Sequence, residues 1–573
     1  MKDKKMYILL VISILFAVVG VSLAFFSLSI IGNDKAKNTK ITTGDLELVF
    51  TDDNEVSLDG AFPGDSIIKT ISVKNTGTKE VSYNIVWQEL LNEITNNELV
   101  IDGTCKNLNS SNAEDGECSA ISKKAVKEGN ITSNIPIKPG YTQEYEVKIT
   151  FIDTGKPQNY NKNKSFKGKL GLTESSAKTI YCTFDGELTQ GAEYVNGQYT
   201  YRYMQEGKAN SWSNITENGW GVILTDKTST EAVTSNLCTY ISDKPVVSMA
   251  DMFAGSQTTS IDVGNFNTSN IVNMSDMFYH IQVTTLDLSN FNTSKVTDML
   301  EMFSYSQVTV LDLGTFDTSK VTRMVYMFSG SQATTLDISN FNTGNVTDMS
   351  GMFESSQVTA LDLGSFDTSN VTDMSQMFSY SCVTELDLSN FDTSNVTDMS
   401  QMFSNSQVTA LDLSSFDTNK VNSMCSMFAE SEVTTLDVSS FDTSNVTNMS
   451  GMFSSSKVTT LNINNFDTSN VTDMSQMFVE SQATSLDLSN FDTSNVTNMS
   501  YMFILSSNLK TIYVGNKFNT TKVNDSSNMF QECTSLVGGA GTTYDANHTD
   551  KEYARIDGGT SNPGYFTDIA DKK

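Results

Sequence analysis

Aspartates recur every 25 residues along the second half of the chain, and a row of carboxylates could bind cations. The positions are Asp287, Asp312, Asp337, Asp362, Asp387, Asp412 and Asp437. Hard divalent cations such as Ca²⁺ prefer carboxylate oxygens as ligands. The row contains no D-x-D-x-D-G loop of the calcium-binding type, so a solvated acidic face that keeps the chain soluble is the main interpretation. We therefore expect no metal site and no cofactor, with Ca²⁺ on these aspartates as the alternative.

Residues suited to catalysis are scarce. The sequence contains only two histidines, His280 and His548, and lacks a Cys-x-x-Cys motif. It also lacks the G-x-S-x-G motif, a P-loop and a dinucleotide-binding fingerprint. Catalysis needs a non-repeated group of perturbed residues in a pocket, and a repetitive sequence offers none. We predict that the protein is not an enzyme and has no catalytic residues.

Four of the seven cysteines form two candidate disulfide pairs. Cys105 and Cys118 bracket a loop rich in Ser, Asn and Glu, whereas Cys182 and Cys238 bracket one compact segment. Both pairs suit disulfides in an oxidising compartment. Three cysteines remain, so at least one is unpaired within a monomer; they are Cys382, Cys425 and Cys533.

Aromatic side chains interrupt a surface that is otherwise small and polar. They lie beside a recurring Met-Phe dipeptide, at Tyr279, Tyr305, Tyr326, Tyr380 and Tyr501. Aromatic anchors carry much of the energy in protein interfaces, so these tyrosines are the candidates for partner binding. Neutral drift at exposed loop positions is the alternative interpretation.

The net charge of the chain excludes one class of partner. Its 67 acidic and 37 basic residues give a formal charge of −30. Nucleic-acid binding needs a basic footprint that neutralises phosphates. We therefore expect no nucleic-acid partner.

The Met-Phe dipeptide belongs to a repeat of 25 residues. It occurs eleven times at this interval, from Met252 to Met502, and once more at Met529. In one unit, Val383, Leu386 and Leu388 follow a V-x-x-L-x-L pattern typical of a strand, and the residues from Val396 to Phe403 have helical spacing. Such units cannot bury their apolar faces alone but share a core when stacked. We predict a solenoid built of a parallel β-sheet plus short helices.

The remaining sequence divides around this array. Residues 1–31 begin with lysines and continue with an uncharged stretch that is long enough to span a membrane. A cleavage site after Ala24 is the alternative to a membrane anchor. We expect residues 32–40 to form a juxtamembrane linker. Residues 41–176 alternate like the strands of an antiparallel β-sandwich. We read residues 177–245 as the N-terminal cap of the solenoid, 246–535 as about twelve repeats, and 536–573 as a C-terminal cap and tail. The predicted fold class is mixed: a solenoid preceded by a β-sandwich.

The repeat sequence L-D-L-S-N-F-D-T-S-N-V-T-D-M-S-x-M-F resembles the BspA-like leucine-rich repeat surface proteins of bacteria. This resemblance implies a leucine-rich repeat fold, display on the cell surface and adhesion. Residues 2–77, with T-T-G-D-L and P-G-D-S-I-I-K-T-I-S-V-K-N-T-G, are similar to the TasA/camelysin group, which includes biofilm-fibre subunits. The metallopeptidase activity linked with camelysin members is not implied here, because no H-E-x-x-H motif is present.

Two functions follow as hypotheses. In the first, the protein is an exported surface protein, anchored by its N-terminal segment or secreted after cleavage, that binds an extracellular protein, a glycan or a neighbouring cell through many weak contacts. In the second, the sandwich self-associates into extracellular fibres and the repeats are a spacer.

Overall fold

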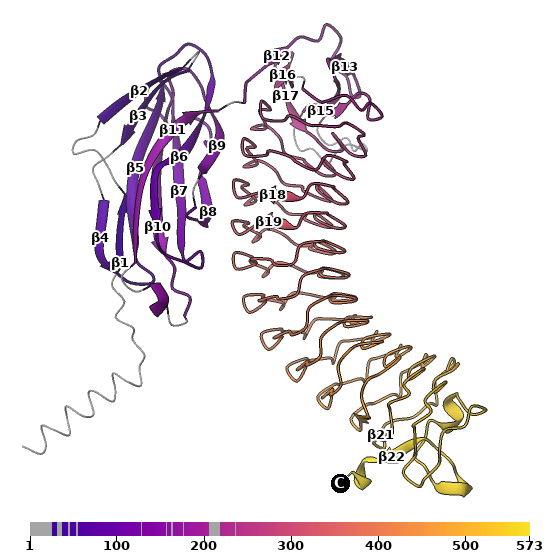
Figure 1. Cartoon of the computed structure of the whole chain (residues 1–573). Coiled ribbons are helices and arrows are strands. Elements are labelled where there is room, and N and C mark those ends of the chain that lie inside the picture. Colours follow the sequence, from indigo (N-terminus) through magenta and orange to yellow (C-terminus); the bar gives the residue numbers. More distant parts are fainter. Residues whose placement is uncertain are drawn as a thin grey trace, which may run out of the picture.

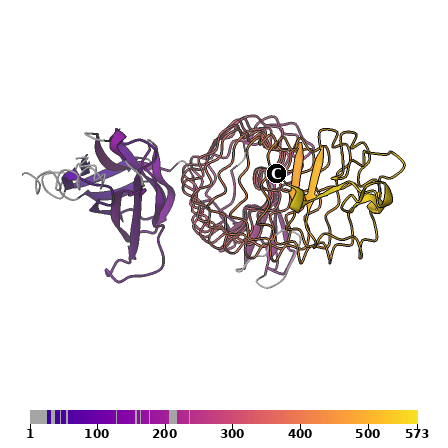
Figure 2. The same ribbon diagram turned by 90° about the horizontal axis from the view of Figure 1, so that it is seen from below.

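The computed structural model describes residues 26–30, 37–43, 46–52, 56–127, 129–155, 158–161, 164–175, 177–205, 218–234 and 236–572. Within these residues the fold is all-β, with strands, turns and four short 3₁₀ turns but no α-helix. A two-sheet sandwich stands beside a long stack of chain coils, and a small sheet joins the two (Figure 1). Viewed along the stack, the sandwich lies against its flank and not over its end (Figure 2).

The sandwich consists of two sheets that enclose one apolar core. The first has the order β4 (Val56–Ala61), β1 (Phe26–Ile30), β11 (Ser165–Glu174), β6 (Val81–Asn92) and β9 (Asn130–Ile137). The second has the order β2 (Lys37–Thr43), β3 (Leu46–Asp52), β5 (Ser66–Asn75), β10 (Thr142–Phe151), β7 (Leu99–Leu108) and β8 (Ile121–Ala125). All pairings are antiparallel except that of β1 with β11. Alternate residues of β5 and β10 are buried, as expected where one sheet face covers a core.

A third sheet links the sandwich to the stack. Its order is β12 (Tyr181–Cys182), β16 (Tyr240–Ile241), β17 (Lys244–Ser248), β15 (Gly219–Leu224), β14 (Tyr199–Met204) and β13 (Glu193–Asn196). Trp220, Tyr199 and Tyr201 are fully buried and belong to the same core as the first coils. This sheet therefore covers the apolar end that the first coil would otherwise expose to water.

Successive coils of the stack are 25 residues apart and bond directly to one another. One continuous column of parallel bridges links the coils. It begins with the pair Ser248 and Asn273, continues through Asp298, and ends at Asp525. A column of buried threonines adds side-chain hydrogen bonds between coils. The hydroxyl of Thr343 donates to the carbonyl of Asp367, and the backbone amide of Asp367 donates to the same hydroxyl. Each coil is thus tied to the next through both backbone and side chains.

The core of the stack is a set of ladders of identical side chains. The phenylalanines of the Met-Phe dipeptides lie with ring centroids 5.5–6.0 Å apart from Phe253 to Phe530. The methionine of each Met-Phe dipeptide is fully buried, and so is a second methionine that stands three residues before it in the coils from Met249 to Met499. Because every coil supplies the same shapes, identical side chains of neighbouring coils pack directly on one another.

The predicted short helices are wrong. The segment from Val396 to Phe403 forms a bridge and turns, and Gln401 within it has a positive φ angle of 58°, which an α-helix does not contain. The amides of Met399, Gln401 and Phe403 donate to carbonyls of the following coil, at 2.7–3.1 Å. A two-turn helix is unfavourable to nucleate, and here the stack itself satisfies these amides.

The predicted leucine-rich-repeat solenoid with its continuous parallel sheet is also wrong. The Leu-x-Leu segments form short strands only at β18 (Val310–Asp312), β19 (Thr335–Asp337) and β20 (Ser485–Leu488). Elsewhere among the described coils they make single bridges, as between Ala360 and Glu385, or none. The repeated aspartate ends each segment, because its side chain binds the backbone amide two residues later and turns the chain.

The C-terminal end departs from the repeat. Strand β21 (Thr511–Val514) pairs with β20 on one side and with β22 (Phe566–Asp568) on the other. Tyr565 and Phe566 contact the last ring of the ladder, Phe530, edge to face. The short 3₁₀ turns are η1 (Asn159–Asn161) in the sandwich and η2 (Lys551–Tyr553), η3 (Gly559–Ser561) and η4 (Ile569–Asp571) at this end.

Candidate binding sites on the stack and at its junction with the sandwich

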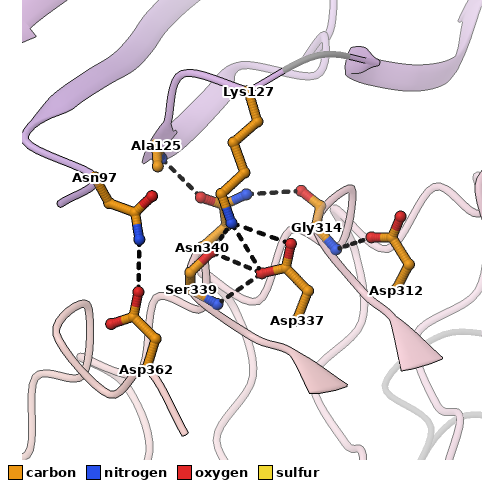
Figure 3. Close-up of polar contacts among 9 residues, drawn as sticks. All are labelled: Asn97, Ala125, Lys127, Asp312, Gly314, Asp337, Ser339, Asn340 and Asp362. Atoms are coloured by element: carbon orange, nitrogen blue, oxygen red, sulfur yellow. Dashed lines mark hydrogen bonds and ion pairs between the residues drawn. The ribbon is translucent and has the colours of Figure 1, made fainter. Parts of the chain in front are cut away.

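The flank of the stack meets the β8–β9 edge of the sandwich through polar contacts. Nδ2 of Asn292 donates to the carbonyl of Asn134 at 3.1 Å, and the amide of Ala125 donates to Oδ1 of Asn340 at 2.7 Å. Nδ2 of Asn97 donates to Asp362 at 2.5 Å (Figure 3). The contacts span four coils, so the sandwich is fixed along the stack at several points.

One ion pair lies at the centre of this junction. Nζ of Lys127 lies 3.1 Å from Asp337 and donates to the hydroxyl of Ser339 at 2.6 Å (Figure 3). Burial raises the pKa of Asp337, but hydrogen bonds from Ser339 and Lys127 outweigh it, so the net pKa lies below the usual value. Asp337 is therefore a charged anchor for the sandwich.

A cavity of about 290 Å³ lies beside this ion pair and is lined by residues of both the sandwich and the stack. Trp87 and Lys124 line it from the sandwich, and Asp312, Thr315 and Asn340 line it from the coils. Lys124 is 8% exposed, and burial lowers the pKa of its ammonium to about 8. Oγ1 of Thr315 is buried without a hydrogen-bond partner. Sequence reasoning missed this cavity, because Lys124 belongs to no periodic pattern.

The repeated aspartates have a structural role. In each coil, Oδ1 accepts a hydrogen bond from the backbone amide two residues later, at 2.9–3.3 Å; the residues are Asp287, Asp312, Asp337, Asp362, Asp387, Asp412 and Asp437. Hydrogen bonds from the serine two residues later, first from its hydroxyl and then from its amide, lower the pKa of Asp412 and Asp437. Across the described residues, no group of three or more His, Cys, Asp or Glu side chains is placed to hold a metal ion.

The five candidate tyrosines lie on one edge of the stack, at the turns around Met-Phe. Tyr305 and Tyr380 are 47% and 57% exposed, and Tyr501 is 38% exposed. Tyr279, His280 and Tyr305 form one ring cluster with centroids 6.1–6.3 Å apart. We call Tyr279, Tyr305, Tyr326, Tyr380 and Tyr501 the tyrosine edge.

Most tyrosines of this edge stand in a backbone conformation that disfavours large side chains. Tyr305, Tyr326, Tyr380 and Tyr501 have φ angles of 52–60°, in columns where other coils have glycine. The left-handed conformation costs roughly 1–2 kcal/mol for a residue with a Cβ. Tyr326 recovers part of this by donating to Oε1 of Gln376 at 2.5 Å, and its ring lies where a Cβ on Gly351 would be.

The cysteines fall into two disulfides and three free thiols. Cys105 bonds to Cys118, and Cys182 bonds to Cys238. Cys382, Cys425 and Cys533 are free. Burial raises the pKa of Cys533 to about 12, so this thiol is unreactive.

Three acidic residues precede Met-Phe in the first three coils. Burial, followed by the charges of Asp251, Glu301 and Asp298, raises the pKa of Asp276 to about 7; Arg323 opposes this increase. Burial also raises the pKa of Asp251 and Glu301. Lys227 donates to the backbone carbonyl of Asp251, and its charge opposes the increase in the pKa of Asp251.

Replacing Asp276 with Asn should stabilise the first coils increasingly as the pH rises from about 4 to 7, with the full gain above pH 7. Native Asp276 retains its proton between about pH 4 and 7 while the unfolded chain has lost it, so stability falls as pH rises through this window. The variant lacks this penalty. We expect a gain of roughly 1 kcal/mol at pH 8, allowing for partial exposure, and no gain near pH 4. Thermal unfolding at the two pH values measures it, and an equal gain at both would contradict the assignment.

A second hollow, of about 360 Å³, lies on the outer face of β5, β7 and β10. Glu144, Glu146 and Lys106 line it with neighbouring threonines. These are the side chains that a solvated sheet face presents, so the hollow carries no functional argument.

Of the predicted N-terminal segment and linker, residues 1–25 and 31–36 lie outside the described residues, whereas Phe26–Ile30 and Lys37–Thr43 form strands β1 and β2 of the sandwich. Among those that are described, no helix has the length and apolar character needed to cross a membrane.

Comparison with known proteins assigns the repeats to a family. The model of the family described as "Mycoplasma protein of unknown function, DUF285" matches residues 229–334, 304–383, 381–485 and 454–556. No curated protein and no solved structure matches the chain. The expected assignments to BspA-like leucine-rich repeat proteins and to the TasA/camelysin group are wrong: the described coils lack the helices and the continuous parallel sheet of a leucine-rich repeat, and the family model that matches is DUF285, with matches that begin at residue 229. Since these matches cover more than half of the sequence, the chain belongs to the DUF285 family.

Proposed function

We propose that this protein is an exported interaction protein whose tyrosine edge binds an extracellular protein or glycan, or a neighbouring cell. The observation that carries the proposal is the exposure of Tyr305 and Tyr380 in left-handed backbone positions. Other coils fill the same column with Ser355 or Asn405. Large aromatic groups in a position that disfavours them suit a binding role better than a role in folding.

The two disulfides support export. Disulfides persist in oxidising compartments and are rare in reducing ones, and both described pairs lie in the N-terminal half of the chain. Attachment through the N-terminal hydrophobic segment, or secretion after its cleavage, is part of this proposal.

Repetition supports binding by many weak contacts. The edge presents aromatic groups from Tyr279 to Tyr501, separated by coils that carry small or polar residues. Contacts linked on one rigid scaffold increase the effective concentration for one another. A partner with repeated features, such as a polymer or a cell surface, therefore gains most from this arrangement.

The test uses the full chain on an array of purified extracellular matrix proteins and glycans. Tyr305→Asn with Tyr380→Asn removes two exposed rings and retains a residue that the column already contains at Asn405. The matched control is Ser355→Asn with Ser455→Asn, in the same column. We expect the tyrosine variant to lose at least tenfold in affinity and the control to change less than twofold. Equal loss in both, or no loss in either, would contradict the proposal.

A fibre subunit is the second candidate, favoured by the sheet edges away from the stack. Strands β2 and β4 end their sheets, each hydrogen-bonded to one described neighbour. Such edges can accept a strand from another chain. Light scattering and electron microscopy of the purified chain test this candidate: polymers support it, and a stable monomer at high concentration eliminates it.

A further inference from the structure

The cavity between sandwich and stack is lined by an unpaired hydroxyl and by a buried ammonium. Oγ1 of Thr315 is buried without a partner. Lys124 is 8% exposed, and the charge of Asp317 offsets only part of the effect of its burial. A buried polar group without a partner costs about 1–3 kcal/mol. A hydroxyl supplied by the coils and an ammonium supplied by the sandwich, both lining one cavity, indicate a ligand that bonds to both.

The cavity size limits the ligand to a small molecule. Its volume of about 290 Å³ lies at the lower end of the range of about 300–1,000 Å³ for small-molecule sites. Junctions between domains are common places for such sites. A single six-membered ring with its substituents fits this space. A peptide or a polymer is too large, and only its terminal residue or unit could enter.

The charges in the cavity favour a neutral ligand with many hydroxyl groups. Lys124 and Lys127 contribute ammonium groups, while Asp312 and Asp337 contribute carboxylates. An anion would meet the carboxylates, and a cation would meet the ammonium groups. A hydroxyl group both donates and accepts hydrogen bonds, so it suits ammonium, carboxylate, amide and threonine alike.

An aromatic ring is held rigidly at the same cavity. The indole of Trp87 contacts Phe166 edge to face, with centroids 5.7 Å apart. It lies over Gly168, where an added Cβ would come within 2.5 Å of the ring. A fixed aromatic surface beside polar groups provides packing for the C–H face of a sugar ring.

We propose that this cavity binds a single neutral sugar ring, packed on Trp87 and hydrogen-bonded by Lys124 and Thr315. The site is separate from the tyrosine edge and does not depend on the proposed function. Because sandwich and coils each supply part of the site, the bound sugar would also strengthen the junction between them.

Saturation-transfer NMR on the full chain tests the proposal with D-glucose, D-galactose and N-acetyl-D-glucosamine. Thr315→Val retains the side-chain shape and removes the unpaired hydroxyl, so it should fold at least as stably as the wild type. Ser406→Ala is the matched control, because its hydroxyl is also buried without a partner in another coil. We expect one of the sugars to bind, Thr315→Val to weaken it at least threefold, Trp87→Leu at least tenfold, and the control less than 1.5-fold.

The proposal is overturned if none of the three sugars binds the wild-type chain, or if Thr315→Val and Ser406→Ala bind alike. It is also overturned if inorganic phosphate binds at this site and the sugars do not, because the cavity is then an anion site. Loss of sugar binding in the Tyr305→Asn and Tyr380→Asn variant would place the sugar on the tyrosine edge and likewise overturn it.

Discussion

Replacing Phe378 with alanine should destabilise the stack by about 3–5 kcal/mol, as expected for a large buried ring. Phe378 is fully buried and stacks on Phe353 and Phe403, with centroids 5.7 and 5.8 Å away. In a linear repeat structure each unit is stabilised by its two neighbours. The space left by the missing ring therefore weakens the interfaces of this coil with both of its neighbours. The coils on either side should then unfold less cooperatively with one another.

Hydrogen exchange with mass spectrometry measures this effect by region. Amide protection should fall most in the coils that contain Phe353, Phe378 and Phe403, and little near Phe503. Tyr380→Asn in the same coil is the control, with an expected change below about 0.5 kcal/mol because Tyr380 is exposed. A uniform loss of protection along the whole stack would contradict the nearest-neighbour account.

Replacing Lys69 with methionine should destabilise the sandwich by about 3–5 kcal/mol. Nζ of Lys69 lies 2.8 Å from Asp52, and both side chains are at most 3% exposed. The pair joins β5 to β3 inside the sheet that contains both. Removing one partner leaves a buried charge without its main compensation.

The double variant Lys69→Met with Asp52→Leu separates charge from packing. An apolar pair of similar volume often replaces a buried ion pair at little cost. We expect it to recover at least half of the lost stability, measured by urea unfolding and by exchange of peptides from β3 and β5. Equal instability of single and double variants would show that packing around Lys69, not charge, dominates.

The repeat period and its core could be predicted from the sequence, because identical side chains recur at one interval. The Met and Phe columns, and Val396 with its equivalents, are buried. The local backbone could not be predicted in the same way. The spacing of Val396, Met399 and Phe403 fits a helix, but the same spacing arises from turns whose amides bind the next coil.

A signal for those turns was present in the sequence. Glycine occupies the left-handed columns at Gly255, Gly330, Gly351 and Gly451. Glycine recurring in a column that otherwise holds Asn, Ser or Glu indicates positive φ and excludes a helix at that point. The aspartates gave a similar signal, because Asx turns end strands. The junction cavity left no signal, because it forms only where two distant segments meet.

The hydrogen-exchange footprint of the full chain bound to its tightest array partner tests directly whether the tyrosine edge is the binding surface. Binding through this edge should give new protection at the turns around Tyr279, Tyr305 and Tyr380, and none at the Asx turns of the aspartate column. Protection confined to the sandwich or to the aspartate column, with the tyrosine edge unchanged, would contradict it.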